Sequence, residues 1–225
     1  METAPLSPEA EAEKWAMGVP RPSYRMARTE KVWFYRAYQG GEPYALIDWR
    51  QSGRSDALWV REHEPITKRP LFLWTCTDEE NKENLTLLLA LARLLIVDER
   101  QVSWLCRHPV PTNLISRVEE QCAQSEAEDE NAFLLEARLP KRESCLVLAA
   151  PFAENEAVWA ARLQLFAAQG ARGVLIDTSQ PHLPTDSLFL TSARNLEWPV
   201  LALKEGQRTE ELLPPLHAQI LRLTL

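Results

Sequence analysis

The 225-residue sequence predicts an α/β protein built on a mostly parallel β-sheet of about five or six strands, with helices on both faces. Three observations lead to this fold class. Short, unbroken apolar runs are typical of strands that are buried on both faces. These runs alternate with helix-like segments. Successive runs begin roughly 25 to 45 residues apart, which suits strand–helix–strand crossovers.

The first 20 residues are expected to form a flexible or loosely attached leader. They begin with "METAPLSPEAEAEK", which is acidic and rich in Pro and Ala. No basic segment precedes an apolar one, so no secretion signal is predicted.

Residues 21–66 are expected to form a small β-hairpin element. Two strand-like runs, 44–49 and 57–62, flank "QSGRSD", a combination that favours a turn between the strands of a hairpin or of a crossing pair.

Residues 67–225 carry the alternating pattern and are expected to form the α/β domain. Strands are predicted at residues 71–74, 101–106, 144–150, 173–178 and 198–203. We expect full burial for the unbroken apolar stretches 71–74, 145–149 and 173–176.

The helix with the most unusual composition is predicted in "DEENKENLTLLLALARLLI". Its acids suit the positive end of a helix, and residues 85–97 are apolar on nearly every face. We therefore expect other elements to cover this helix on most sides. Its apolar part is too short to span a membrane.

Two further helices are predicted between the later strands. "VPTNLISRVEEQCAQ" offers Thr112 or Asn113 as a cap, and "AENEAVWAARLQLFAAQG" ends at Gly170. In the second helix one face carries three large apolar residues, namely Trp159, Leu163 and Phe166. The C-terminal segment is expected to be a helical tail that Pro214 and Pro215 break.

Composition limits the possible functions. The chain is 45% hydrophobic and 25% charged, which is ordinary for a soluble globular protein. A net charge of -7 disfavours nucleic acid and anionic membranes as general partners. The four cysteines show no paired spacing, so reduced, mostly buried thiols in a cytoplasmic protein are expected. A zinc site from Cys106, His108 and Cys122 lacks both a C-x-x-C pair and an obvious fourth ligand.

Known catalytic and nucleotide-binding motifs are absent from the sequence. It contains no G-x-G-x-x-G, no G-x-x-x-x-G-K-[ST] and no G-x-S-x-G. A hydrolase on an α/β scaffold stays an alternative, but no convincing pair of nucleophile and base follows the strands.

The segment "RAYQGGEPYALIDWRQSGRSDALWVREHE" resembles the signature of a widespread bacterial family, domain-of-unknown-function family 58. That pattern is R-x-Y-x-x-G-D-x-x-R-x-I-D-W-x-x-S-A-R-x-x-x-L-x-V-R-E-x-E. The positions that match are Arg36, Tyr38, Gly41, Ile47, Asp48, Trp49, Ser52, Arg54, Leu58, Val60, Arg61, Glu62 and Glu64. The chain departs from the pattern at Glu42 (Asp in the family), Ala45 (Arg) and Gly53 (Ala), and the family's usual membrane-anchored segment before the signature is missing.

The resemblance implies a von Willebrand factor A-like, Rossmann-like domain after the signature. Members of the family are typically encoded beside MoxR-type AAA+ ATPases and are thought to assist them in assembling or activating other proteins. By this resemblance we expect a non-enzymatic interaction module whose partner is such an ATPase or a membrane complex, without a cofactor.

The signature residues have both a structural and a docking interpretation. Asp48 and Glu62 can pair with Arg50, Arg54 or Arg61, and such a network would fasten the hairpin. Trp and Arg are also favoured anchors of protein interfaces. The candidate docking residues are Arg36, Tyr38, Asp48, Trp49, Arg50, Arg54, Trp59, Arg61 and Glu62. Acid–base catalysis by Asp48, Glu62 and His63 is a weaker interpretation, because neighbours on a strand point to opposite faces.

A von Willebrand A-type Mg²⁺ site requires D-x-S-x-S after the first strand, and the resemblance places Trp74, Cys76 and Asp78 at these positions. After a later strand, Ala150 and Pro151 stand where relatives tend to have Ser and Asp. We expect a degenerate metal site, since Trp, Ala and Pro side chains cannot coordinate Mg²⁺. A Mg²⁺-dependent binding domain of the same fold is the alternative.

Overall fold

The structure is a computed structural model that describes residues 7–19, 33–40, 42–63, 69–76, 81–106, 108–125, 144–179, 183–203 and 206–223, except for the side chains of residues 33, 34 and 61–63. The chain divides into two compact units. The larger unit comprises Met1–Pro20 and Lys68–Leu225, and the smaller unit comprises Arg21–Thr67.

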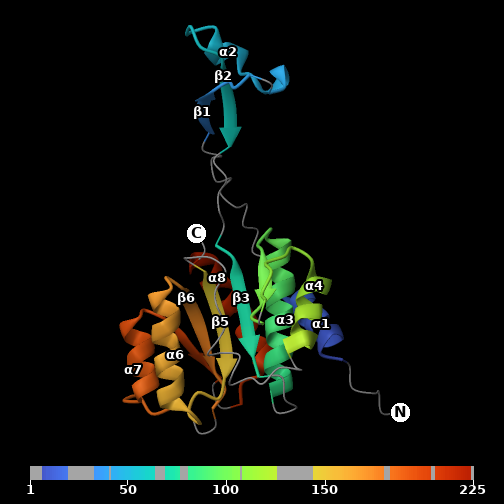
Figure 1. The fold of residues 1–225 in the computed structure, drawn as a ribbon. Coiled ribbons are helices and arrows are strands. Elements are labelled where there is room, and N and C mark those ends of the chain that lie inside the picture. The colour runs from blue at the N-terminus through green and yellow to red at the C-terminus, as the bar shows by residue number, and fades with distance from the viewer. Residues whose placement is uncertain are drawn as a thin grey trace, which may run out of the picture. The chain divides into compact units, whose positions relative to one another are not determined.

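The larger unit is built on a five-stranded parallel sheet, which confirms the predicted α/β class (Figure 1). Its strands are β3 (Leu71–Thr75), β4 (Val102–Trp104), β5 (Cys145–Ala150), β6 (Arg172–Asp177) and β7 (Val200–Ala202). Their order in the sheet is β4-β3-β5-β6-β7. The chain runs from β3 outward to β4 at one edge, and then from β5 outward to β7 at the other edge. In doubly wound sheets of this kind the strand order reverses between the two halves, here between β3 and β5, and this place is called the switch point.

The three central strands are buried as the sequence predicted. Every residue of β3 and β5 is buried, and so is β6 after its first residue. Successive side chains face opposite sides of a strand, so a strand covered on both faces must be apolar at every position. This condition explains the unbroken runs "LFLW" and "CLVLAA".

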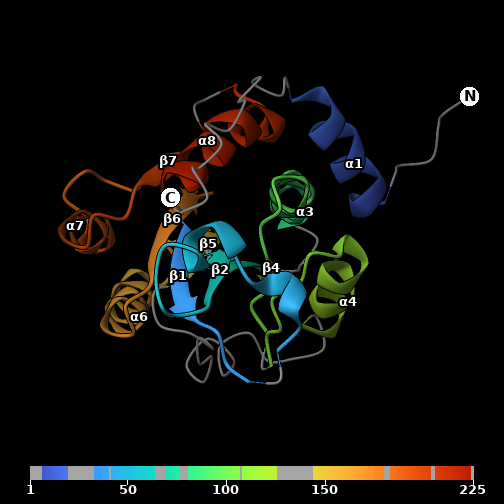
Figure 2. The ribbon, with the colours of Figure 1, turned by 90° about the horizontal axis from the view of Figure 1, so that it is seen from above.

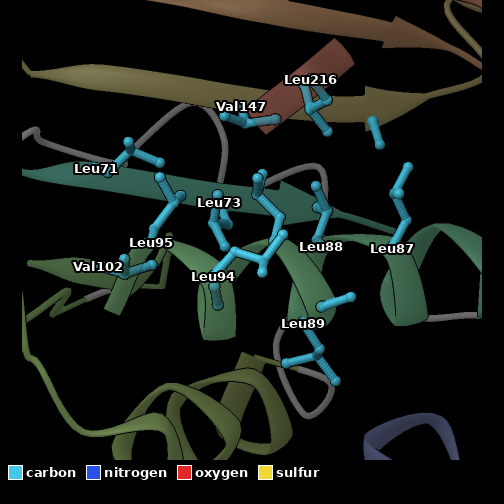
Figure 3. Close-up of a cluster of buried hydrophobic side chains, with 14 of the residues drawn as sticks. Leu71, Leu73, Leu87, Leu88, Leu89, Leu94, Leu95, Val102, Val147 and Leu216 are labelled. Atoms are coloured by element: carbon cyan, nitrogen blue, oxygen red, sulfur yellow. The ribbon is translucent and has the colours of Figure 1, made fainter. Parts of the chain in front are cut away.

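Helix α3 (Lys82–Val97) occupies the middle of one face, and its deep burial confirms the prediction for the apolar helix. Leu88 and Leu95 lie between α3 and β3, whereas Leu89 points away from the strand (Figure 3). Both sides of the helix are therefore enclosed, and Leu88 and Leu89 are 0% and 1% exposed.

Three more helices complete this side of the sheet: α1 (Pro8–Gly18), α4 (Ile115–Ser125) and α8 (Leu213–Leu223). Each of them contacts α3, and residues from each join the same apolar core (Figure 2). Ser7 caps α1 by accepting the N–H of Ala10. Thr112, one of the two predicted caps near α4, accepts the N–H of Leu114.

The position of α1 corrects the expectation of a flexible leader. Ala12 is completely buried, and Trp15, Ala16 and Val19 pack against the core. The acidic, Pro/Ala-rich composition gives little sign of a buried face. A short helix can pack on a core through one small buried residue and a few partly buried ones. Residues 1–6 lie outside the described residues.

The opposite face is covered by α6 (Glu156–Ala168) and α7 (Leu188–Asn195). The predicted apolar face of α6 is confirmed, because Trp159, Leu163 and Phe166 all lie in the second core. Gly170 follows the helix with φ of 79°, the left-handed conformation expected of a glycine stop signal. Helix α7 was not predicted from the sequence.

The prediction of a helical tail broken at two prolines is wrong in detail. A short 3₁₀ helix, η3 (Thr209–Leu212), leads into α8, and Pro214 and Pro215 occupy the first turn of α8. N–H groups in a first turn have no partner within the helix, so proline costs nothing there and begins the helix instead of breaking it.

The smaller unit contains an antiparallel hairpin of β1 (Trp33–Ala37) and β2 (Trp59–His63). The predicted strand at 57–62 is thus largely confirmed, but the strand predicted at 44–49 is wrong. That segment forms a 3₁₀ helix, η1 (Tyr44–Leu46), and the start of α2 (Trp49–Ser52). Only Ile47 makes a strand-like bridge, to Val60.

None of the described helices is both long and apolar enough to cross a membrane.

We predict that Gly173→Ala destabilises the larger unit by about 1–3 kcal/mol, the usual cost of overpacking. A Cβ atom at Gly173 would lie 2.6 Å from the carbonyl oxygen of Leu146 and 2.7 Å from the Trp198 ring. Thermal unfolding monitored by circular dichroism measures the effect. Gly18→Ala is the matched control in the same unit, because no atom lies within 4 Å of its new Cβ. Equal melting temperatures for the two variants would contradict the packing described between β6 and Trp198.

Candidate functional site

The signature segment is organised around an ion pair between Arg36 and Glu42. Arg36 lies on β1, and its guanidinium donates to both carboxylate oxygens of Glu42, at 2.9 and 2.5 Å. The backbone N–H of Gln39 donates to the same carboxylate at 2.9 Å. The side chains of Arg36 and Glu42 are 27% and 23% exposed. A planar guanidinium matches a carboxylate in this two-bond geometry, so the pair fixes the turn after β1.

These contacts change the acidity of Glu42. The hydrogen bonds from Arg36, followed by that from the Gln39 backbone, lower the pKa of Glu42 from 4.5 to about 2. Glu42 stands where the resembling family has Asp, and the structure shows that the longer acid still reaches the arginine.

Tyr38 closes the same turn. Its hydroxyl donates to the backbone carbonyl of Glu42 at 2.7 Å, and its ring stacks on Tyr44 with 5.8 Å between the centroids. The predicted docking residues Arg36 and Tyr38 therefore have clear structural roles.

Asp48 is a helix cap. Its Oδ1 accepts the backbone N–H groups of Arg50 and Gln51 at 3.1 and 3.0 Å, and its Oδ2 accepts the Tyr35 hydroxyl at 3.5 Å. Capping satisfies N–H groups that have no partner within the helix.

The predicted pairing of Asp48 with an arginine side chain is corrected by this geometry. Arg50 contributes its backbone N–H and not its guanidinium, and no ion pair of Arg54 occurs among the described residues. The side chains of Arg61 and Glu62 lie outside the described part of the structure, so their predicted pairing stays a prediction. The sequence correctly selected Asp48 as an important carboxylate. It could not show that backbone N–H groups, and not arginine side chains, would donate to it.

Ser52 and Ser55 fasten the segment to β2. The buried Ser52 accepts the backbone N–H of Trp59 at 2.8 Å, and Ser55 accepts the Trp59 indole N–H at 2.7 Å. The backbone N–H of Asp48 donates to the Trp59 carbonyl at 2.8 Å. Trp59 is therefore a structural residue as well, and with Ile47 and Val60 buried nearby it forms a compact base for α2.

Three of the predicted docking residues have no such role. The Trp49 side chain is 61% exposed at the start of α2, and Arg50 and Arg54 are also exposed. No side-chain hydrogen bond or ion pair engages any of the three within the described residues. The indole of Trp49 is thus open to a partner, and this separates the three residues from the rest of the signature.

The structure adds exposed apolar residues that the sequence analysis had not selected. Near Trp49 in the chain, Tyr44, Leu46 and Leu58 are 69%, 49% and 41% exposed. The strand predicted at 44–49 does not form, and Tyr44 and Leu46 lie instead in the exposed 3₁₀ helix η1.

A second candidate region is the edge of the larger unit's sheet where the strands end, next to the switch point between β3 and β5. Ligands of doubly wound proteins bind at this place. Trp74, at the first degenerate metal position, is 3% exposed and packs on Trp159 with 5.4 Å between ring centroids. Its ring belongs to the core and does not line the edge as a ligand would.

The remaining degenerate positions offer little to a metal ion. Cys76 is half-buried and packs against the same core, Ala150 is buried, and Pro151 follows it. Asp78 lies outside the described residues. The described residues at these positions do not fit Mg²⁺, which requires hard oxygen ligands.

Other polar side chains at this edge either form hydrogen bonds within the protein or are buried without a hydrogen bond. Asp177 Oδ1 accepts the backbone N–H and the hydroxyl of Ser179, at 3.1 and 2.6 Å. Thr75 Oγ1 is buried without a hydrogen-bond partner. No cluster of three or more His, Cys, Asp or Glu residues suited to a metal occurs among the described residues.

A buried arginine lies on the same side of the sheet as Cys76. Arg162 of α6 is 4% exposed, and its guanidinium carbon sits 5.0 Å from the centre of the Trp159 ring. Desolvation lowers the pKa of Arg162, while the charge of Cys76 opposes this shift. Cys145, by contrast, is held as a neutral thiol, because burial raises its pKa to about 12. All four cysteines are free, and three are buried, which confirms the prediction of mostly buried thiols.

Comparison with known proteins gives no further information on the site: no protein-family model, curated protein or solved structure matches the chain.

We predict that the Glu42 carboxyl titrates near pH 2 in the intact protein and moves toward its ordinary value in an Arg36→Met variant. Because the pKa is lowered on folding, the stabilisation by Glu42 is fully present above about pH 4.5 and is lost as the pH falls toward 2. Carbon-detected NMR of the side-chain carboxyl groups measures both titrations. A Glu42 midpoint near 4.5 in the parent chain would show that the ion pair does not form.

Proposed function

We propose that the chain is a non-enzymatic protein–protein interaction module, an accessory partner of a MoxR-type AAA+ ATPase in the assembly or activation of other proteins. In this proposal the larger unit is a von Willebrand factor A-like domain and the protein works in the cytoplasm. The parallel sheet with helices on both faces supports that choice of fold. The family signature in the smaller unit supports the choice of partner.

The observation that carries the proposal is the contrast within the signature. Arg36, Tyr38, Asp48, Ser52 and Trp59 are each engaged in hydrogen bonds inside the smaller unit. Folding alone therefore accounts for them.

Trp49, Arg50 and Arg54 are signature-segment residues that the internal network does not use. We call these three side chains the Trp49 surface. Trp and Arg dominate the binding energy of protein interfaces, since both combine a large apolar area with directional donors. The two arginines give the surface positive charge within a chain whose net charge is -7. It therefore suits an acidic partner surface with an apolar pocket for the indole.

Rigid support favours binding by this surface. The Asp48 cap and the Ser52 contact to β2 hold the short helix that carries Trp49. A side chain presented on a fixed backbone loses less conformational entropy on binding than one on a free loop.

The alternatives have no specific observation in their favour. The described residues at the metal positions do not fit Mg²⁺. The sequence carries no motif of a hydrolase.

Binding between the purified chain and the purified MoxR-type ATPase of the same organism tests the proposal. We expect Trp49→Ala, combined with Arg54→Ala, to weaken binding by about 2 kcal/mol or more, roughly thirtyfold. Leu165→Ala is the matched control, because Leu165 is 54% exposed but lies on α6 of the larger unit. Biolayer interferometry provides the affinities, and thermal unfolding confirms that each variant folds.

Two outcomes would contradict the proposal. One is no binding between the parent chain and the ATPase. The other is an equal loss of binding in the Leu165→Ala control, which would move the docking surface away from the signature.

A further inference from the structure

The register of the hairpin shows which backbone groups of β1 face away from β2. The backbone N–H of Tyr38 donates to the Leu58 carbonyl at 2.8 Å, and β1 and β2 continue this antiparallel register. Hydrogen-bonded and non-hydrogen-bonded pairs alternate along an antiparallel ladder. Arg36 therefore faces β2 with its backbone groups, while the N–H and C=O groups of Trp33, Tyr35 and Ala37 face outward.

The outer edge of β2 is covered at the start of the strand. Its outward groups include those of Trp59, whose carbonyl accepts the N–H of Asp48 and whose N–H donates to Ser52. Ile47 adds a bridge to Val60. The signature segment thus covers the start of this edge, at Trp59 and Val60.

Among the described residues, nothing covers the outer edge of β1 in this way. The sheet of the smaller unit has two strands, and within the described residues no other strand pairs with β1. Arg36 Nη1 contacts the Ala37 carbonyl at 3.2 Å, which leaves a second lone pair on that oxygen. Tyr35 is 43% exposed, and Ala37 is also exposed.

Natural proteins protect open strand edges with Pro, charged side chains or bulges. At its outward positions, the strand "WFYRA" has none of these. Its single charged residue, Arg36, faces β2 with its backbone and is neutralised by Glu42. An isolated two-stranded hairpin is also only marginally stable, so a third strand would stabilise it.

We propose that β1 pairs with β1 of a second copy of this chain, antiparallel and centred on Tyr35, to form a continuous four-stranded sheet β2-β1-β1-β2. The occupant is a second copy because the edge is complementary to itself. With Tyr35 opposite Tyr35 of the other copy, Trp33 lies opposite Ala37 in both directions. All three pairs then bring outward N–H and C=O groups face to face, as a two-fold axis requires.

The side chains and charges agree with this pairing. Directly opposed tyrosines are favourable cross-strand neighbours, whereas like charges would oppose pairing and none lies at the three outward positions. The contact is short, so we expect association at micromolar or weaker affinity that depends on concentration. It leaves Trp49 outside the paired strands, and it does not depend on the identity of the partner proposed above.

The first test is sedimentation velocity of the full chain across a range of concentrations. The parent is expected to form a dimer as the concentration rises, and Ala37→Pro, which removes an outward N–H, to shift the dimer dissociation constant upward by about tenfold or more. Ala37→Thr retains the N–H and is the matched control, expected to dimerise like the parent. A parent that stays monomeric up to millimolar concentration, or an Ala37→Pro variant that dimerises like the parent, would overturn the proposal.

A second test stays informative if Ala37→Pro disturbs the hairpin. Hydrogen-bonded antiparallel partners have Cα atoms about 5.5 Å apart, within the range that a disulfide spans. Oxidised Tyr35→Cys should therefore form a covalent dimer faster than Gln39→Cys, an exposed position outside β1. Equal rates for the two variants would overturn the pairing and would favour another occupant of the edge, such as a strand of a different protein.

Discussion

The enclosure of α3 is the constraint on which the larger unit depends. A helix that is apolar on nearly every face cannot rest on a sheet alone, because its outer side would stay in water. β3 covers one side, and α1, α4 and α8 contact the helix around it. Each fully buried leucine contributes about 1.5–3 kcal/mol, so the many leucines of α3 outweigh the weak helical pattern of the N-terminal segment and recruit it as α1. On this side of the sheet α3 forms a first layer, and α1, α4 and α8 pack around it because its outer face is also apolar.

The smaller unit relies on polar contacts instead. Among its described residues the buried apolar side chains are Ile47 and Val60, and the Arg36–Glu42 pair and the Asp48 cap hold the segment around them. Hydrogen bonds with fixed geometry specify one conformation where a core is too small to do so. The same network carries Trp49 outward on a supported helix, which links the structural use of the signature to its proposed use as a docking surface.

The sequence predicted the larger unit well, because unbroken apolar runs permit few alternatives. β3, β5 and β6, the enclosed α3 and the apolar face of α6 all follow from residue patterns. Prediction from the sequence failed in the smaller unit, where a polar side chain decides the conformation instead of burial. The run at 44–49 has the residues of a strand, but Asp48 caps a helix there, and the partner strand of β2 is β1. In the candidate site the sequence selected Asp48 and Trp49, but it could not separate residues that support the fold from residues left exposed, since that distinction requires the geometry of the contacts.

Hydrogen exchange of the full chain, followed by mass spectrometry, tests most directly whether the enclosure of α3 holds the larger unit together. Peptides from α3, β3 and β5 should exchange slowest of all the described elements, because their amides open only with the whole unit. Ala12→Arg places a charge on the buried face of α1 and should accelerate exchange in α3, whereas Met17→Arg, at a position 75% exposed on the same helix, should not. Exchange in α3 that is as fast as in α4 in the parent, or that is unchanged by Ala12→Arg, would contradict the account.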